Sequence, residues 1–190
     1  LEAKGWLALL APLVSALLVL ALIAPARRFG MVDHPGGRKN HDHPTPLVGG
    51  LAIFLAFLIV NALAGAIPGE SQSLLAAMAV TVAVGVLDDA HEIGHRSKFF
   101  AQIAAALLVA TGTSVHMMHF GDLFGLGDIE LGKWAPLVTV VSIVGLMNAI
   151  NMIDGVDGMA GSVVLPQLMI HAALAATSGP GRLAFELLAL

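Results

Sequence analysis

Four side chains with oxygen donors lie close together at the end of an apolar stretch that follows Lys133. Asn148, Asn151 and Asp154 recur every third residue, and Asp157 follows after Gly155. Helical residues at this spacing share one face, and carboxylate and amide oxygens are the ligands that Mg²⁺ prefers. Ionisable groups at membrane depth are costly, so a functional site is the default interpretation. The pattern favours a Mg²⁺ site, with Mn²⁺ as an alternative metal, over a polar turn between helices.

A second acidic pair, Asp88 and Asp89, follows the apolar run that ends at Leu87. No basic residue is directly beside them in the sequence, so a cation is their expected partner. The alternative is a solvated helix cap. Lys98 lies ten residues beyond Asp88. Its side chain either binds a phosphate or extends along the membrane surface to reach water, and both interpretations stay open.

Arg38, Lys39 and His41 lie in a glycine-rich segment between the first two apolar stretches. These side chains suit phosphate binding, and glycines allow close backbone approach. The same segment also fits an ordinary basic loop at the cytoplasmic membrane surface. Taken alone, the segment favours the second interpretation.

The composition indicates an integral membrane protein. The chain has 190 residues, of which 57% are hydrophobic and only 12% charged, and its mean hydropathy is +0.88. A soluble domain is rarely so apolar. The net charge of −4 argues against nucleic-acid binding, and the absence of cysteine excludes disulfides and thiol chemistry.

Six apolar stretches are long enough to cross a bilayer, which takes about 20 helical residues. We expect an all-α integral membrane protein, a polytopic bundle with six transmembrane helices and the start of a seventh near Arg182. Residues 1–190 would form a single transmembrane catalytic domain, an incomplete part of a longer protein. Pro25 and Pro68 are expected to end helices, and Gly158 to allow a sharp turn. The expected helices lie near residues 5–24, 48–67, 73–87, 99–115, 135–150 and 159–177.

The distribution of lysine and arginine predicts the orientation. Basic residues concentrate on the cytoplasmic side of short loops. Six of them fall on one predicted side and three on the other, which predicts an N-terminus outside and all the polar clusters on the cytoplasmic face of the plasma (inner) membrane. The six are Arg27, Arg28, Arg38, Lys39, Arg96 and Lys98, and the three are Lys4, Lys133 and Arg182.

Three stretches, Gly30–Gly50, Val84–Gln102 and Asn148–Ala160, resemble the polyprenyl-phosphate N-acetylhexosamine-1-phosphate transferases. The first stretch, which contains the pattern Asp33-x-Pro35, is more similar to the GlcNAc-1-phosphate branch than to the peptidoglycan branch. The resemblance implies Mg²⁺-dependent transfer of the sugar phosphate from a UDP-N-acetylhexosamine to polyprenyl (undecaprenyl) phosphate, with release of UMP. This reaction would start the synthesis of a cell-envelope polysaccharide such as lipopolysaccharide. A homodimer is left open.

The same resemblance implies a role for each site residue. Those expected to be catalytic are Asp88, Asp89, Asp154 and Asp157; those that bind substrate are Arg38, Lys39, His41, Lys98 and Asn148; and those that hold the metal are Asn151, Asp88 and Asp154. The family's further Asp and its His-rich loop would follow residue 190, so we expect the site to be incomplete within this chain.

Two other functions are alternatives. An ion-coupled transporter would need acids near the bilayer midplane and an internal repeat, but the acids here end the apolar stretches and no repeat is present. An inactive membrane scaffold is the other alternative, because the expected site is incomplete.

Overall fold

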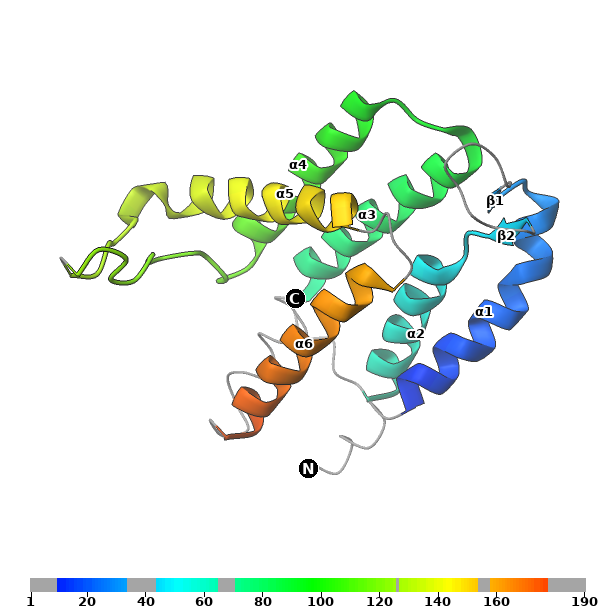
Figure 1. Ribbon diagram of the computed structural model, residues 1–190, viewed down its shortest axis with the longest axis horizontal. Helices are drawn as coiled ribbons and strands as arrows, with labels where there is room; N and C mark the ends of the chain where they lie inside the picture. Colours follow the sequence, from blue (N-terminus) through cyan, green and yellow to red (C-terminus); the bar gives the residue numbers. More distant parts are fainter. Residues whose placement is uncertain (1–9, 34–43, 65–70, 126, 154–157, 178–190) are drawn as a thin grey trace. The chain divides into compact units, whose positions relative to one another are not determined.

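The computed structural model describes residues 10–33, 44–64, 71–125, 127–153 and 158–177, which fall into two compact units, Leu1–Ala101 and Gln102–Leu190 (Figure 1). The first unit holds α1 (Ala11–Arg28), β1 (Val32–Asp33), β2 (Thr45–Pro46), α2 (Gly49–Ala64), α3 (Ser71–His91) and the start of α4 (His95–Gly112). The second holds the rest of α4, the 3-10 turn η2 (Gly132–Trp134), α5 (Ala135–Ile153) and α6 (Met159–Thr177). The mainly helical architecture is therefore confirmed.

Within these described residues, three helices are long and apolar enough to cross a membrane. They are Ala11–Arg28, Gln72–His91 and Gly132–Ile153. Shorter apolar helices cover Gly49–Leu63 and Met159–Ile170. A membrane protein with several helices fits these findings, whereas the full set of six spans stays a prediction. The seventh helix near Arg182 lies outside the described residues, as does Pro68. The prediction of a single domain also stays a prediction.

Several predicted helix ends were wrong, including those of α1 and α3. Pro25 does not end α1, which continues to Arg28, and the amide of Phe29 donates to the carbonyl of Pro25 at 3.0 Å. A proline removes one amide donor, but its own φ is helical, and membrane helices tolerate it. The helix α3 was expected to end at residue 87 and runs on to His91. The apolar run of α3 ends at Leu87, but its helical backbone hydrogen bonding continues to His91.

A two-stranded antiparallel hairpin departs from the all-α prediction. Val32 pairs with Pro46 and Asp33 with Thr45. The strand β1 contacts α3, and β2 contacts α1. Strands this short leave no alternating pattern in a loop rich in glycine and proline, so the sequence did not reveal them. The hairpin attaches Asp33 to the end of α3 that carries the acidic pair.

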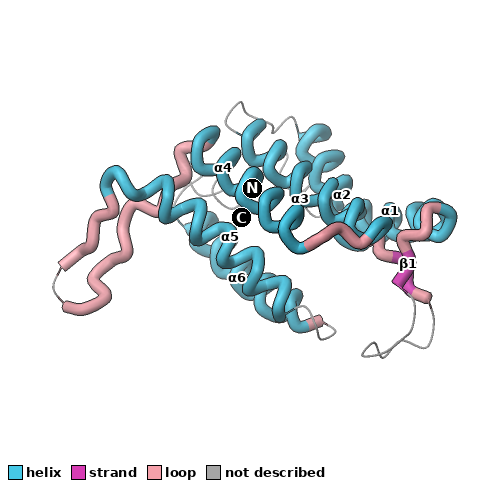
Figure 2. Tube along the Cα trace, turned by 90° about the horizontal axis from the view of Figure 1, so that it is seen from above, coloured by secondary structure: helices cyan, strands magenta, loops and turns pink. Residues whose placement is uncertain are grey.

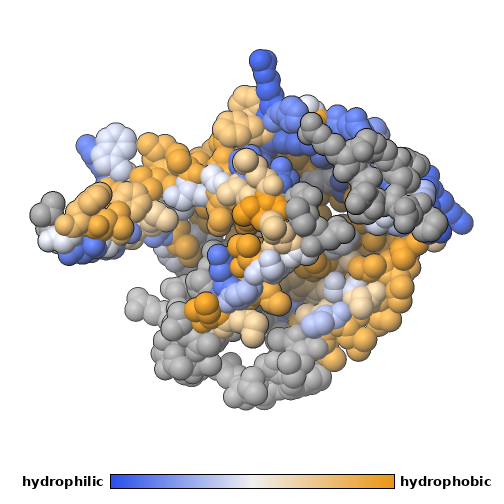
Figure 3. Space-filling model, in the orientation of Figure 1, coloured by the Kyte–Doolittle hydropathy of each residue, from blue (hydrophilic) through white to orange (hydrophobic). Residues whose placement is uncertain are grey.

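Small residues are buried on α1 and α2, which contact each other and lie side by side (Figure 2). Ala26 and Ala52 are fully buried and Ala56 is nearly so. Close backbone approach through small side chains is typical of helix packing in membranes. The large side chains instead point outward, as at Leu20, which is 68% exposed. Hydrophobic surface accordingly covers much of the helices in Figure 3, as expected for a protein surrounded by lipid.

Candidate functional site

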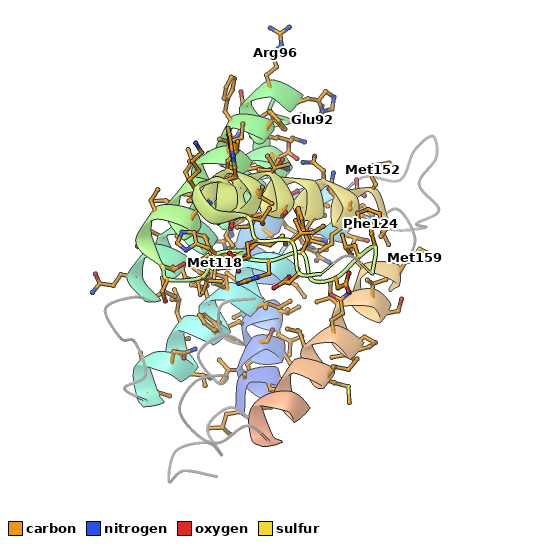
Figure 4. All side chains as sticks on the ribbon, turned by 90° about the vertical axis from the view of Figure 1, so that its left-hand side faces the viewer. Glu92, Arg96, Met118, Phe124, Met152 and Met159 are labelled. Carbon is orange, nitrogen blue, oxygen red and sulfur yellow. The ribbon has the colours of Figure 1, made fainter. Side chains whose placement is uncertain are left out.

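A tight turn joins α3 to α4 and brings the acidic pair near the first turn of α4. The amide of Glu92 donates to the carbonyl of Asp88 at 2.8 Å, and Glu92 has a positive φ of 47°. The carbonyl of Gly94 then accepts from the amide of Lys98 at 3.3 Å. Figure 4 labels Glu92 and Arg96 in this region. The turn reverses the chain, so that Lys98 faces back toward Asp88.

Lys98 forms an ion pair with Asp88. The Nζ atom lies 2.6 Å from Oδ2, and the two side chains are 36% and 28% exposed. The sequence predicted that a cation would accompany the acidic pair, and Lys98 supplies one positive charge there. Since both partners are partly exposed, the pair itself contributes little to stability. The ion pair is more important because it holds a cationic hydrogen-bond donor next to two carboxylates.

Asp33 adds a third carboxylate to this end of α3. The negative charges of Asp33 and Asp88 repel that of Asp89, whereas the positive charge of Lys98 attracts it. The sequence pattern alone does not assign Asp33 to the site, although Asp33-x-Pro35 contributes to the family resemblance. In the described part of the chain, no three His, Asp or Glu side chains are grouped closely enough to hold a metal ion. This cluster would need other donors to complete a metal site.

In the second unit, Asn148 links α5 to α4. Its Nδ2 donates to Oε1 of Gln102 at 2.8 Å and to the carbonyl of Val144 at 2.8 Å. Both amide hydrogens are thus used within the protein, so any ligand contact through this side chain would fall on its amide oxygen. The sequence reasoning expected Asn148 to bind substrate and missed its partner. Gln102 is a polar residue within an apolar run, which indicates that it needs a hydrogen-bonding partner.

The remaining predicted site residues are only partly described. Asn151 is exposed in the last turn of α5, beside Met152, which is 84% exposed and labelled in Figure 4. Gly158 has a φ of +75° and precedes α6, which confirms the predicted sharp turn there. Five predicted site residues lie outside the described residues: Arg38, Lys39, His41, Asp154 and Asp157.

Comparison of the sequence with known families identifies the chain. Residues 71–190 match the sequence profile of Glycosyl transferase family 4. The chain belongs to glycosyl transferase family 4. The match runs from the start of α3 to the end of the chain, so it includes Asp88, Asp89, Lys98 and the segment Asn148–Asp157. The family that the resemblance indicated is confirmed.

Curated proteins from two bacteria are similar to part of this chain. The Bacillus subtilis (strain 168) "Probable undecaprenyl-phosphate N-acetylglucosaminyl 1-phosphate transferase" is 33% identical over 67% of this chain and 37% of its own length. The "Undecaprenyl-phosphate alpha-N-acetylglucosaminyl 1-phosphate transferase" of Yersinia pestis is 33% identical over 60% of this chain and 32% of its own length. The chain thus spans about a third of the length of these relatives. No solved structure matches it.

Proposed function

We propose that the protein containing this chain transfers N-acetylhexosamine-1-phosphate, specifically GlcNAc-1-phosphate, from a UDP-sugar to polyprenyl phosphate. The observation that carries the proposal is the ion pair of Lys98 with Asp88, at the end of a helix apolar enough to cross a membrane. It lies in the region that matches glycosyl transferase family 4. The names of the similar proteins from Bacillus subtilis and Yersinia pestis support both the undecaprenyl-phosphate acceptor and the transferred group.

The reaction needs a phosphate nucleophile rather than a strong general base. A phosphate oxygen of the lipid attacks the sugar-linked phosphorus, the bond from that phosphorus to UMP breaks, and polyprenyl-diphospho-sugar forms. The second pKa of a phosphate monoester is about 6, so the lipid phosphate is largely ionised at neutral pH. Lys98 would bind phosphate through a charge-assisted hydrogen bond. Asp88 would position Lys98 and the incoming group rather than remove a proton.

The oxygen donors present suit a Mg²⁺ cofactor, with Mn²⁺ as the alternative. Asp88 and Asp89 supply carboxylates in the last turn of α3, and Asn151 supplies an exposed amide in the last turn of α5. These are hard ligands of the kind that Mg²⁺ selects. By the family resemblance, Asp88, Asn151 and Asp154 would hold the ion. When bound, it would neutralise charge on the diphosphate and the leaving UMP.

The other site residues would bind the two substrates. By resemblance, Asp154 and Asp157 would engage the UDP-N-acetylhexosamine, and Arg38, Lys39 and His41 would bind phosphate. Asn148 would contact the substrate through its amide oxygen. The excess of lysine and arginine on one predicted side supports a multi-pass protein of the plasma (inner) membrane with this site facing the cytoplasm. A homodimer is left open.

Release of UMP from UDP-GlcNAc tests the proposal. Proteoliposomes with undecaprenyl phosphate would be prepared with residues 1–190 and, separately, with the chain extended through its natural C-terminus. We expect the extended protein to release UMP only when both the lipid and Mg²⁺ are present. If the folded extended protein releases no UMP from any UDP-N-acetylhexosamine, the proposal is wrong.

A further inference from the structure

Gln102 is the only polar side chain of α4 between Lys98 and Thr111. Its Oε1 accepts from Nδ2 of Asn148 in α5 at 2.8 Å, and both side chains are half-buried. An amide in an apolar helix needs a protein partner because hydrocarbon offers none. The bond therefore accommodates both amides, and its direction also decides which of their atoms face outward.

The carbonyl of Val144 fixes the orientation of the Asn148 amide. That carbonyl lies 2.8 Å from Nδ2, and a carbonyl oxygen can only accept a hydrogen bond. Val144 is buried, so little water competes for this bond. Since the nitrogen must face Val144, its second hydrogen is the one that Gln102 binds. With both hydrogens bound, the amide cannot turn without breaking a bond.

The amide oxygen of Asn148 has no partner among the described residues. The same part of the chain contains no buried side-chain nitrogen or oxygen atom that lacks a hydrogen bond. Oδ1 is therefore accessible from outside the protein. An acceptor with a fixed direction suits a ligand group that has a hydrogen to donate. An ionised phosphate oxygen has none, and Oδ1 would repel it.

The two proposed substrates differ in such donor groups. Polyprenyl phosphate is a hydrocarbon chain with an ionised phosphate, whereas a UDP-N-acetylhexosamine carries several hydroxyl and N–H groups. Asn148 therefore suits the sugar nucleotide rather than the lipid. Asn151, which the family resemblance assigns to the metal, follows three residues later in α5. Residues at this spacing share a helix face, so the Asn148 acceptor lies on the face that carries a proposed metal ligand.

We propose that Gln102 is a positioning residue, which holds the Asn148 amide so that its oxygen accepts a hydrogen bond from a hydroxyl or N–H group of the UDP-N-acetylhexosamine. Gln102 acts through Asn148 and does not itself touch the substrate. This inference rests on the proposed function, because it requires that sugar nucleotide as the donor of the transferred group.

A kinetic double-mutant cycle tests the inference in the chain extended through its natural C-terminus. Gln102→Met replaces the acceptor by an apolar side chain of similar length, and Asn148→Ala removes the amide that Gln102 positions. We expect Gln102→Met to raise KM for UDP-GlcNAc by about five- to tenfold, as for the loss of one hydrogen bond. The kcat should stay within about two-fold, and KM for undecaprenyl phosphate should not change. In the Asn148→Ala background, Gln102→Met should have no further effect on KM.

A merely structural role would lower the fraction of active protein, and with it kcat, at an unchanged KM for UDP-GlcNAc. That result would overturn the inference. An equal rise in KM in the Asn148→Ala background would also overturn it, because Gln102 would then act without Asn148. If Gln102→Met alone does not fold, the comparison of Asn148→Ala with the double variant still decides, since neither amide is left to lack a partner in the double variant.

The wild type in the same assay separates this inference from the proposed function. No UMP release from the folded wild type would refute the transfer reaction, and this inference with it. Normal release by the wild type, together with unchanged kinetics in Gln102→Met, would refute only the role of Gln102.

Discussion

The ammonium group of Lys98 lies 2.6 Å from a carboxylate oxygen of Asp88, across the turn that joins α3 to α4. A lysine bound to a carboxylate and partly exposed can exchange that partner for an incoming phosphate without leaving its place. The pair thus connects the end of an apolar helix to the phosphate chemistry that we propose for this family member.

Loss of Lys98 should reduce activity far more than stability. We expect Lys98→Met to lower kcat/KM for UMP release by about 100-fold or more, because a charged donor to the reacting phosphates is removed. The unfolding free energy should change by at most about 1 kcal/mol, since the ion pair is partly exposed. Lys98→Arg is the control and should retain part of the activity. A methionine variant with activity within a few-fold of the wild type would refute this role.

The hydrogen bond from Asn148 to Gln102 should couple α4 to α5 energetically. Gln102→Ala leaves a donor without its partner and should destabilise the protein by about 1–3 kcal/mol. A double-mutant cycle with Asn148→Ala should give a coupling free energy of about 0.6 kcal/mol, the usual size between membrane helices. Denaturant unfolding in detergent measures both quantities. Strictly additive effects of the two substitutions would show that the bond contributes nothing.

Asp33 should influence the metal requirement. Its carboxylate acts electrostatically on Asp89, so Asp33→Asn lowers the negative charge at this end of α3. We expect the Mg²⁺ concentration for half-maximal UMP release to rise several-fold, while Asp33→Glu, which keeps the charge, should have a smaller effect. An unchanged Mg²⁺ dependence in the asparagine variant would show that Asp33 does not influence the proposed metal site.

Adjacent positions on α2 should respond differently to substitution by leucine. Ala52 is fully buried, so Ala52→Leu should overpack the contact of α2 with α1 and cost about 1–3 kcal/mol. Ile53 is 64% exposed, and Ile53→Leu should leave stability nearly unchanged because its side chain faces outward. Thermal unfolding in detergent compares the two variants. Equal stability would mean that small residues do not determine this packing.

The sequence predicted the helices best where polar or turn-forming residues border an apolar run. Both bounds of α6 and the start of α5 agree with the expected 159–177 and 135. The end of α4 was placed at residue 115, whereas the helix ends at Gly112. Apolar composition does not distinguish a helix from extended chain in the same environment, and the apolar run continues beyond Gly112.

The tertiary partners of the candidate site residues were hard to predict from the sequence. The reasoning on the sequence selected Asp88, Asp89 and Lys98, and the structure brings Asp88 and Lys98 together. It did not find the link between Gln102 and Asn148, which are 46 residues apart. Such a pairing depends on the rotation of each helix about its axis, which a nearly uniform apolar helix does not reveal. Asp33 was missed because the short hairpin that carries it has no periodic signal.

The central claim is that the sugar moves together with its phosphate. UDP-GlcNAc labelled with ³²P at the β-phosphate, the one linked to the sugar, tests this directly in proteoliposomes containing undecaprenyl phosphate and the chain extended through its natural C-terminus. The account predicts ³²P in the lipid extract and unlabelled UMP in water. Sugar in the lipid extract with ³²P remaining in water as UDP would contradict it, because the sugar alone would then have been transferred.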